Sequence, residues 1–316
     1  MSFALISALH GAIKGLSLPR IRLLAGAAGD LLRMLDRPSR RQEMARRLSE
    51  IYPQLSPSDI RRIIREVYRW LFISMADSLH FHRLLLAGRA REHLELVNES
   101  GRPLPESGRG VIFASGHFGW WEISCMAMGV FGYPGVVIAR KMRNPLLEEY
   151  VARLRETQGV RQMPKEGALR PALKALKEGR SLAVMTDQDA RYHGIFVDFL
   201  GKPASTYPSP AQLAIAAGAP VVFLYCLRKG ESDRYRIVIK DIIYPDRRAD
   251  RQEEIRRITQ RLADNLAGMV RAYPDRWLWL HRRWKTYPGK YDDKGKKIKS
   301  KKSTQSTRST QSTARP

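Results

Sequence analysis

The chain has 316 residues, of which 43% are hydrophobic, and its 56 Lys and Arg against 31 Asp and Glu give a formal charge of +25. This hydrophobic content excludes disorder throughout and is enough for one large core, or for a core with a small appendage. The charge predicts attraction to an anionic partner, whether nucleic acid, anionic lipid or acidic protein, and says little about the fold. Two cysteines, Cys125 and Cys226, are far apart and flanked by apolar residues, which favours buried, reduced thiols over a disulfide.

Residues 1–37 mix apolar and basic positions. The longest uncharged run, 1–13, is shorter than the roughly 18 to 20 residues of a membrane-spanning helix, and the order of a cleavable signal peptide is missing. The apolar positions recur among Arg and Lys as in an amphipathic helix on a membrane surface, although core helices give the same pattern. We therefore predict a retained, membrane-associating amphipathic segment over 1–37.

A helical pattern follows from Pro38 to about Arg89. The sequence Ser56-Pro-Ser-Asp59 predicts an N-terminal cap. An apolar stripe follows the cap at Ile60, Ile63, Ile64, Val67, Trp70 and Leu71. We expect this helical preface to be part of a main domain over residues 38–290.

After the turn-rich segment 101–110, short apolar runs alternate with helical patterns, which predicts an α/β fold with a central mixed sheet flanked by helices. The expected strands are Val111–Ser115, Val136–Ala139, Leu182–Thr186, Val221–Leu227 and Arg234–Ile239. The expected helices are Trp120–Gly129, Pro145–Gln158, Gly167–Glu178, Ser209–Ala217 and Arg251–Arg271. Lys-rich sequence and Ser/Thr/Gln repeats over 291–316 predict a disordered basic tail.

His117 and Glu122 have the spacing H-x4-E in a segment that reads as a strand, a Gly-marked turn and the start of a helix. On one helix, residues five apart point about 140° away from each other, so the two side chains can meet only if His117 lies in the turn. A carboxylate there can orient the imidazole while the other ring nitrogen takes a proton from an acceptor hydroxyl. In that geometry His117 can act as a general base with Glu122 as its orienting carboxylate, and removing a proton from an alcohol beside a thioester is the step that acyl transfer needs.

A second match to this spacing, His193 and Asp198, lies in a stretch of alternating apolar residues. That alternation is typical of an extended segment rather than of a turn that enters a helix. The context therefore favours His117.

The block Gly116-His-Phe-Gly-Trp-Trp-Glu122 resembles the catalytic block of the bacterial lipid A biosynthesis acyltransferase family, within the glycerolipid and lysophospholipid acyltransferase superfamily. The resemblance covers about residues 1–288. Further blocks in the family's order are Arg140-Lys-Met-Arg-Asn-Pro-Leu-Leu147, the helix with Arg155, Asp187-Gln-Asp189, Phe196-Val-Asp-Phe-Leu-Gly-Lys-Pro-Ala-Ser-Thr206 and Trp277-Leu-Trp-Leu-His-Arg-Arg-Trp-Lys285.

This resemblance implies that His117 is the general base and Glu122 its orienting carboxylate, and it implies further site residues. Arg155 and Asp187 match positions that support the active site and bind substrate, although Arg155 taken alone reads as a solvated helix charge. Asp187 comes just after an expected strand, where α/β folds commonly place ligand sites. Arg140 also follows a strand and is expected to contact substrate. Trp277 and its aromatic and basic neighbours indicate packing on the sheet rather than a membrane-facing belt.

The resemblance further implies a donor, an acceptor and a location. The donor would be an acyl carrier protein thioester or acyl-CoA, and an acidic carrier would suit the basic surface. The acceptor would be a lipid A precursor or related glycolipid, or alternatively an aminolipid or phosphoglycolipid, at the cytoplasmic face of the inner membrane, with the enzyme peripheral or monotopic. Neither a cofactor nor a metal is expected. Nucleic-acid binding is the competing class, but no zinc-ligand spacing, phosphate loop or RNA-binding motif supports it.

Overall fold

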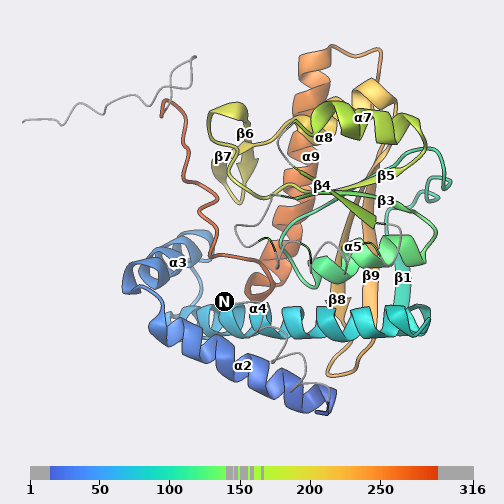
Figure 1. Ribbon diagram of the computed structural model, residues 1–316. Coiled ribbons are helices and arrows are strands. Elements are labelled where there is room, and N and C mark those ends of the chain that lie inside the picture. Colours follow the sequence, from blue (N-terminus) through green and yellow to red (C-terminus); the bar gives the residue numbers. More distant parts are fainter. Residues whose placement is uncertain are drawn as a thin grey trace, which may run out of the picture.

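The structure, a computed structural model, describes residues 15–139, 160–164 and 167–290 together with Pro145, Glu149 and Glu156. Its centre is a seven-stranded sheet with the order β1-β9-β8-β2-β5-β3-β4 (Figure 1). The strands are β1 (Leu94–Asn98), β2 (Ile112–Ser115), β3 (Gly135–Ala139), β4 (Val160–Pro164), β5 (Ser181–Met185), β8 (Val221–Arg228) and β9 (Tyr235–Ile243). Only the pairing of β8 with β9 is antiparallel, so the predicted mixed sheet is confirmed.

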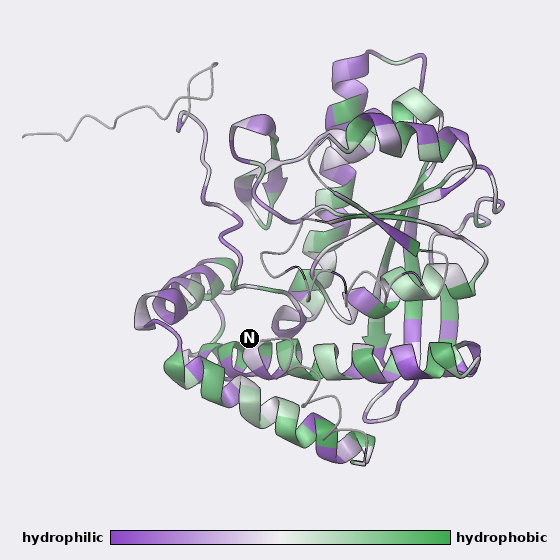
Figure 2. Cartoon of the chain, in the orientation of Figure 1, coloured by the Kyte–Doolittle hydropathy of each residue, from purple (hydrophilic) through white to green (hydrophobic). Residues whose placement is uncertain are grey.

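Helices cover both faces of this sheet. One face carries the helices α7 (Leu169–Lys177), α8 (Ser209–Ala217) and α9 (Arg251–Ala272), and the other carries α5 (Trp121–Val130) (Figure 1). Successive residues of β8 point to opposite faces, as a strand requires: Val221 and Phe223 belong to the core with α9, whereas Val222 and Leu224 belong to the core with α5. Figure 2 colours these central strands largely hydrophobic.

Among the described residues, three α-helices precede the sheet: α2 (Leu18–Leu35), α3 (Pro38–Ile51) and α4 (Pro57–Leu86). The predicted cap is confirmed, because Ser56 and Asp59 form a reciprocal capping box at the start of α4. α2 packs closely on α4 through small residues, since a Cβ on Gly29 would lie 2.6 Å from the carbonyl oxygen of Tyr68. A buried ion pair of 2.7 Å between Arg22 and Asp77 joins the same two helices.

Two differences from the prediction lie at the edges of the sheet. β1 and β4, its two edge strands, were not expected, because each is five residues long and carries polar residues or a proline instead of an apolar run. β9 also continues to Ile243, beyond the expected end at Ile239. A hairpin of β6 (Ile195–Phe199) and β7 (Lys202–Thr206) forms a separate two-stranded sheet.

The remaining predictions concern residues that are only partly described. The expected helix over 145–158 lies outside the described residues except for Pro145, Glu149 and Glu156, which are helical. Residues 1–14 and the tail 291–316 also lie outside them. In the part of the chain that is described, no helix combines the length and the apolar character needed to cross a membrane.

Candidate active site

His117 and Asp187 meet at the carboxyl edge of two neighbouring parallel strands. In the register of β2 and β5, Ser115 lies opposite Met185, and each candidate residue follows its strand by two positions. The Nδ1 atom of His117 lies 2.8 Å from Oδ1 of Asp187. Carboxyl ends of parallel strands are where open α/β sheets place their ligand sites, so the topology itself brings this pair together.

The turn that carries His117 depends on two glycines. At Gly119, φ is +57°, a backbone conformation that favours glycine, and a Cβ would lie 2.0 Å from the carbonyl oxygen of Cys226. At Gly116, a Cβ would approach the side chain of Leu266 to 2.7 Å. The turn therefore packs directly on β8 and α9, and at Gly119 the backbone contact leaves no space for a side chain.

Backbone hydrogen bonds hold the same turn from the C-terminal side. Leu278 donates its N–H to the carbonyl of His117 at 3.0 Å, and Gly119 donates its N–H to the carbonyl of Arg276 at 2.8 Å. Trp120 also donates its N–H to the carbonyl of Cys226 at 2.9 Å. Because the turn is hydrogen-bonded on both sides, the His117 backbone is held in place, and this limits the movement of the imidazole attached to it.

The helical preface contributes to the site through α4. The indole of Trp70 donates a hydrogen bond of 3.1 Å to the carbonyl of Gly119, and the indole of Trp120 donates one of 2.7 Å to Asp77. Asp77 is fully buried and also pairs with Arg22 of α2 and Arg228 of β8. α4 thus stabilises the turn that carries His117, and the Arg22–Asp77 ion pair links α2 to α4.

Asp187 is buried and accepts hydrogen bonds at both of its oxygens. Besides the contact with the His117 ring, its Oδ2 accepts from the His117 N–H at 2.8 Å and from the Trp277 indole at 2.9 Å. Burial alone would raise the pKa of Asp187, but the His117 charge and these hydrogen bonds hold that pKa well below its usual range. Asp187 is therefore a fixed, ionised carboxylate, and it selects the His117 tautomer with the proton on Nδ1.

The pKa of His117 is raised above that of a free histidine. Burial on its own would lower this pKa, but the charge of Asp187 and its hydrogen bond outweigh the burial, and the charge of Glu122 adds to the rise. With Nδ1 occupied by Asp187, Nε2 is the ring nitrogen left for a substrate. The site therefore holds an imidazole whose basicity is increased, which suits a general base.

Glu122 lies in the first turn of α5 and lines the same cavity as His117. As the spacing required, His117 lies in the turn and Glu122 lies in the helix that follows. The carboxylate that accepts the hydrogen bond from Nδ1, however, is Asp187, to which sequence reasoning gave only a supporting role. The H-x4-E argument compared residues close in sequence, whereas the register of β2 and β5 places a carboxylate 70 positions away directly beside the ring.

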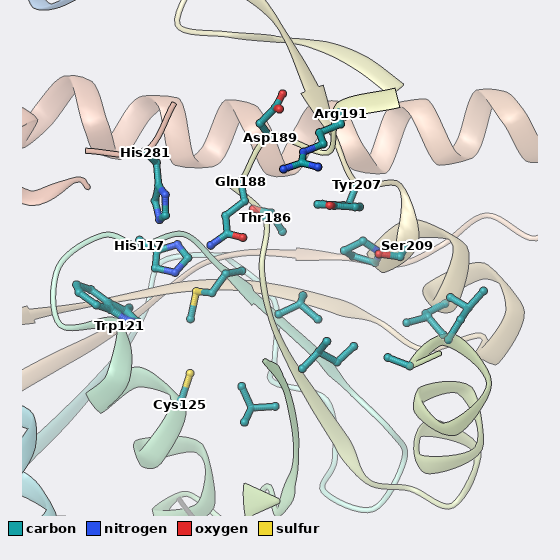
Figure 3. A pocket seen from close by; sticks show the side chains of 18 of the residues that line it. His117, Trp121, Cys125, Thr186, Gln188, Asp189, Arg191, Tyr207, Ser209 and His281 are labelled. Atoms are coloured by element: carbon teal, nitrogen blue, oxygen red, sulfur yellow. The ribbon is translucent and has the colours of Figure 1, made fainter. Parts of the chain in front are cut away.

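A cavity of about 690 Å³ opens in front of His117 (Figure 3). One part of its lining is apolar and comes from α5, the strand ends and the starts of α7 and α8. These residues are Trp121, Cys125, Val137, Ile138, Ala168, Leu169, Val184, Met185, Pro210 and Leu213. The other part is polar or charged, with His117, Glu122, Thr186, Gln188, Asp189, Arg191, Tyr207, Ser209, His281, Arg282 and Lys285. The cavity can accept an apolar chain beside a polar group near His117.

His281 is a residue of this site that the sequence did not single out as functional. Its ring meets the ring of His117 edge to face, with centroids 5.0 Å apart (Figure 3). Burial, followed by the nearby charge of His117, lowers the pKa of His281, which favours a neutral ring beside His117. Its position within the Trp277–Lys285 block was the only sequence signal for it.

The other sequence-predicted residues fall into three groups. Arg140 and Arg155 lie outside the described residues. His193 ends a short 3-10 turn and Asp198 lies in β6, where its backbone N–H bonds Gln260, and neither lines the cavity. Trp277 is fully buried, which confirms packing on the sheet. The described residues contain no cluster of His, Cys, Asp or Glu arranged to hold a metal ion.

A histidine and a buried aspartate lie at the carboxyl edge of the α/β sheet, in front of a partly apolar cavity, and this arrangement is compatible with acyl transfer. The model of the family described as bacterial lipid A biosynthesis acyltransferase matches residues 12–286. The chain therefore belongs to this family, whose members are acyltransferases.

Several curated relatives are similar to this chain. It is 27% identical over 202 residues to a phosphatidylinositol mannoside acyltransferase of Mycolicibacterium smegmatis, and the match covers 62% of this chain. The chain spans 64% of that relative's length, which is less than two thirds. It is 26% identical over 255 residues to the lipid A biosynthesis palmitoleoyltransferase of Escherichia coli, covering 79% of the chain and 80% of the relative. It is 24% identical over 272 residues to the lipid A biosynthesis lauroyltransferase of Escherichia coli, covering 84% and 85%.

Among solved structures, the 1-acyl-sn-glycerophosphate acyltransferase of Thermotoga maritima aligns with 79% of this chain and 97% of its own. The TM-score is 0.38 at 15% sequence identity, a likeness too remote to carry an argument.

Proposed function

We propose that this protein transfers a fatty acyl group from a thioester donor to a hydroxyl of a membrane glycolipid, with His117 as the general base. The observation that carries the proposal is the 2.8 Å contact between His117 Nδ1 and Asp187 at the head of a partly apolar cavity. This contact directs Nε2 to the substrate, and the apolar lining offers a place for the acyl chain.

The reaction balances without a cofactor. Nε2 of His117 takes the proton of the acceptor hydroxyl as its oxygen attacks the thioester carbonyl, and the ionised Asp187 stabilises the imidazolium that forms. When the C–S bond breaks, the imidazolium returns its proton to the leaving sulfur, so a thiol and an ester are produced. Both proton transfers use the same nitrogen, which explains why one well-oriented histidine is enough.

In this proposal Glu122 acts on His117 through its negative charge. As a carboxylate in the same cavity it adds to the negative potential around His117 and favours the imidazolium. Its place in the first turn of α5 suits a negative charge, because the helix N-terminus carries a partial positive charge. Arg140 and Arg155, both cationic, keep their proposed role in binding the substrate.

The acceptor is proposed to be a lipid A precursor or a related glycolipid. The relatives support this class from two directions, since one is named for a phosphatidylinositol mannoside and others for lipid A. A phosphoglycolipid is therefore the alternative acceptor. The donor is proposed to be an acyl carrier protein thioester or acyl-CoA.

We further propose that α2 rests on the inner membrane. At about 100° per residue, Leu24, Leu31 and Leu35 share one face of α2, and they are 57%, 55% and 75% exposed. Arg22 and Gly29, which pack on α4, lie on the opposite side. Figure 2 shows hydrophobic and hydrophilic positions interspersed along α2, at the lower edge of the molecule. Such a helix binds a bilayer surface without crossing it.

The test is a pair of measurements with the purified protein and with the source strain. Transfer of a radiolabelled acyl chain from acyl-CoA and from an acylated carrier protein should be followed with lipid A precursor and with phosphatidylinositol mannoside as acceptors. In a deletion strain, mass spectrometry of lipids should show one species without one acyl chain. A lipid profile identical to wild type, together with no transfer from either donor, would contradict the proposal.

A further inference from the structure

We infer that the mouth of the catalytic cavity contains a phosphate-binding subsite formed by Arg191, Arg282 and Lys285. All three residues line the cavity and are exposed at its rim. This inference rests on the proposed acyl transfer, and it names a chemical feature of the substrate: a phosphate ester or diester close to the reacting groups.

The three cations have no carboxylate partner within the described ranges. Ion pairs are plentiful elsewhere on this basic surface, but none involves the side chains of Arg191, Arg282 or Lys285. Asp189, the acidic neighbour in the lining, accepts hydrogen bonds from Thr286 instead. The three cations outnumber the two carboxylates of the same lining, Glu122 and Asp189, and they lie together at the rim, where they create a potential that attracts an anion.

The segment that carries Arg282 and Lys285 is fixed in place by the residues between and beside them. Arg283 is 1% exposed and donates to the carbonyl of Ser205 at 2.6 Å and to the hydroxyl of Thr206. Thr286 donates its hydroxyl to Asp189 at 3.0 Å. Because Arg283 and Thr286 anchor this segment from within, the exposed Arg282 and Lys285 are held in fixed positions at the rim.

Arg191 adds a second kind of support, because its backbone is in the left-handed region. Its φ is +56°, a conformation that costs roughly 1 kcal/mol or more for a residue with a Cβ. The Ser205 hydroxyl donates to the Arg191 carbonyl at 2.6 Å and fixes this conformation. Figure 3 shows the guanidinium extending over the cavity near Gln188 and Asp189. A planar guanidinium can bind phosphate through two parallel hydrogen bonds.

The subsite lies next to the reacting centre. Arg282 directly follows His281, whose ring contacts the ring of His117. An anion held there would fix one end of a substrate while the reacting carbon or hydroxyl lies at His117. Both substrates of the proposed reaction offer such a group: the phosphopantetheine arm of the donor, and the phosphate of a phosphorylated glycolipid.

Direct binding is the first test, and it does not depend on catalysis. Pyrophosphate should be titrated calorimetrically into the full-length protein, into Arg282→Gln/Lys285→Gln, and into the control Arg256→Gln/Arg271→Gln. The control removes the same two charges from exposed positions on α9 that do not line the cavity. Loss of charge-assisted hydrogen bonds should weaken binding about tenfold or more in the first variant only. No measurable binding by wild type, or equal weakening in both variants, would overturn the inference.

Kinetics then identify which substrate carries the phosphate. The Michaelis constants of the Arg282→Gln/Lys285→Gln variant and of wild type should be measured for two donors: acyl-CoA, and the N-acetylcysteamine thioester, which lacks phosphate. The same constants should be measured for the acceptor before and after its phosphate is removed. An increase seen with acyl-CoA but not with the short thioester assigns the subsite to the donor. An increase that disappears with the dephosphorylated acceptor assigns it to the acceptor.

The remaining outcomes are also decisive. An unchanged Michaelis constant for every substrate, or the same increase with the phosphate-free pair as with the phosphorylated pair, overturns the subsite. If wild type binds pyrophosphate but transfers no acyl group with any pair, the proposed function fails and the subsite stands. Thermal unfolding of the variants, matched to wild type, excludes a folding defect as the cause of either loss.

Discussion

Oδ1 of Asp187 lies 2.8 Å from Nδ1 of His117, although the two residues are 70 positions apart in the sequence. The short distance follows from the pairing of β2 with β5, which places the residues after the two strands side by side. Asp187 holds both the ring and the backbone N–H of His117. The tautomer and the orientation of the imidazole therefore depend on this buried carboxylate, which also raises the basicity of the ring together with Glu122.

The first prediction concerns pH. A general base must be neutral, so kcat/KM should rise with pH through the pKa of His117, which Asp187 and Glu122 raise above the usual 6.5. In Asp187→Asn the raising charge is gone while burial still lowers the pKa, so the acidic limb should move to lower pH. The maximal rate should fall by about 10⁴-fold, because the proton is no longer held on Nδ1. Rate profiles from pH 5 to 9 measure both effects.

Glu122→Gln is the matched comparison for this pH shift. Glu122 contributes to the raised pKa through its charge only, after the charge and hydrogen bond of Asp187. Its acidic limb should therefore move in the same direction as that of Asp187→Asn, but by less. A shift toward higher pH in either variant would be incompatible with these carboxylates stabilising the imidazolium.

A second prediction tests the apolar face of α2. Changing Leu24, Leu31 and Leu35 together to serine should reduce binding to phosphatidylethanolamine and phosphatidylglycerol vesicles by roughly 100-fold or more, since each leucine side chain contributes about 1 to 2 kcal/mol when buried. Tyr244→Ser, which changes an exposed apolar residue after β9, is the control. Vesicle flotation at low and high salt is the measurement, and wild-type binding that high salt removes completely would disprove apolar docking.

A third prediction concerns the buried ion-pair cluster of Arg22, Asp77 and Arg228, which is hydrogen-bonded to Trp120 next to the His117 turn. Asp77→Ala leaves Arg22 and Arg228 without their carboxylate partner and removes the acceptor of the Trp120 indole. The free energy of unfolding should fall by about 3 to 5 kcal/mol. Glu99→Ala, which breaks an exposed pair with Lys240, should cost at most about 1 kcal/mol. Urea unfolding compares the two, and equal losses would mean that the cluster is not a structural support.

Much of the fold could be predicted from sequence because its signals are local. The apolar runs of β2, β5 and β8 and the capping box of α4 depend on neighbouring residues, and the structure places them close to the predicted positions. The edge strand β4 could not be recognised in the same way. Its sequence has no apolar alternation, and it is a strand because β3 supplies a partner along its length.

The candidate site could be predicted only in part for a related reason. His117 was identifiable because its turn has its own glycine and strand signals, whereas the dominant partner of its ring is set by strand order, which spacing does not encode. The same limit applies to His281, which reaches the site only because the chain after α9 folds back against the His117 turn.

The most direct test of the account is a double-mutant cycle on the His117–Asp187 pair. Single-turnover acyl transfer should be measured at saturating donor and acceptor for His117→Ala, Asp187→Ala, the double variant and the control His193→Ala, each verified to be folded. His117→Ala should lose about 10²- to 10⁴-fold.

The double variant should be no slower than the worse single variant, because residues that act as one unit are non-additive. His193→Ala, outside the cavity lining, should keep most of its activity. Additive losses in the cycle, or an inactive His193→Ala beside a nearly normal His117→Ala, would contradict the assignment of His117 and Asp187 as the catalytic pair.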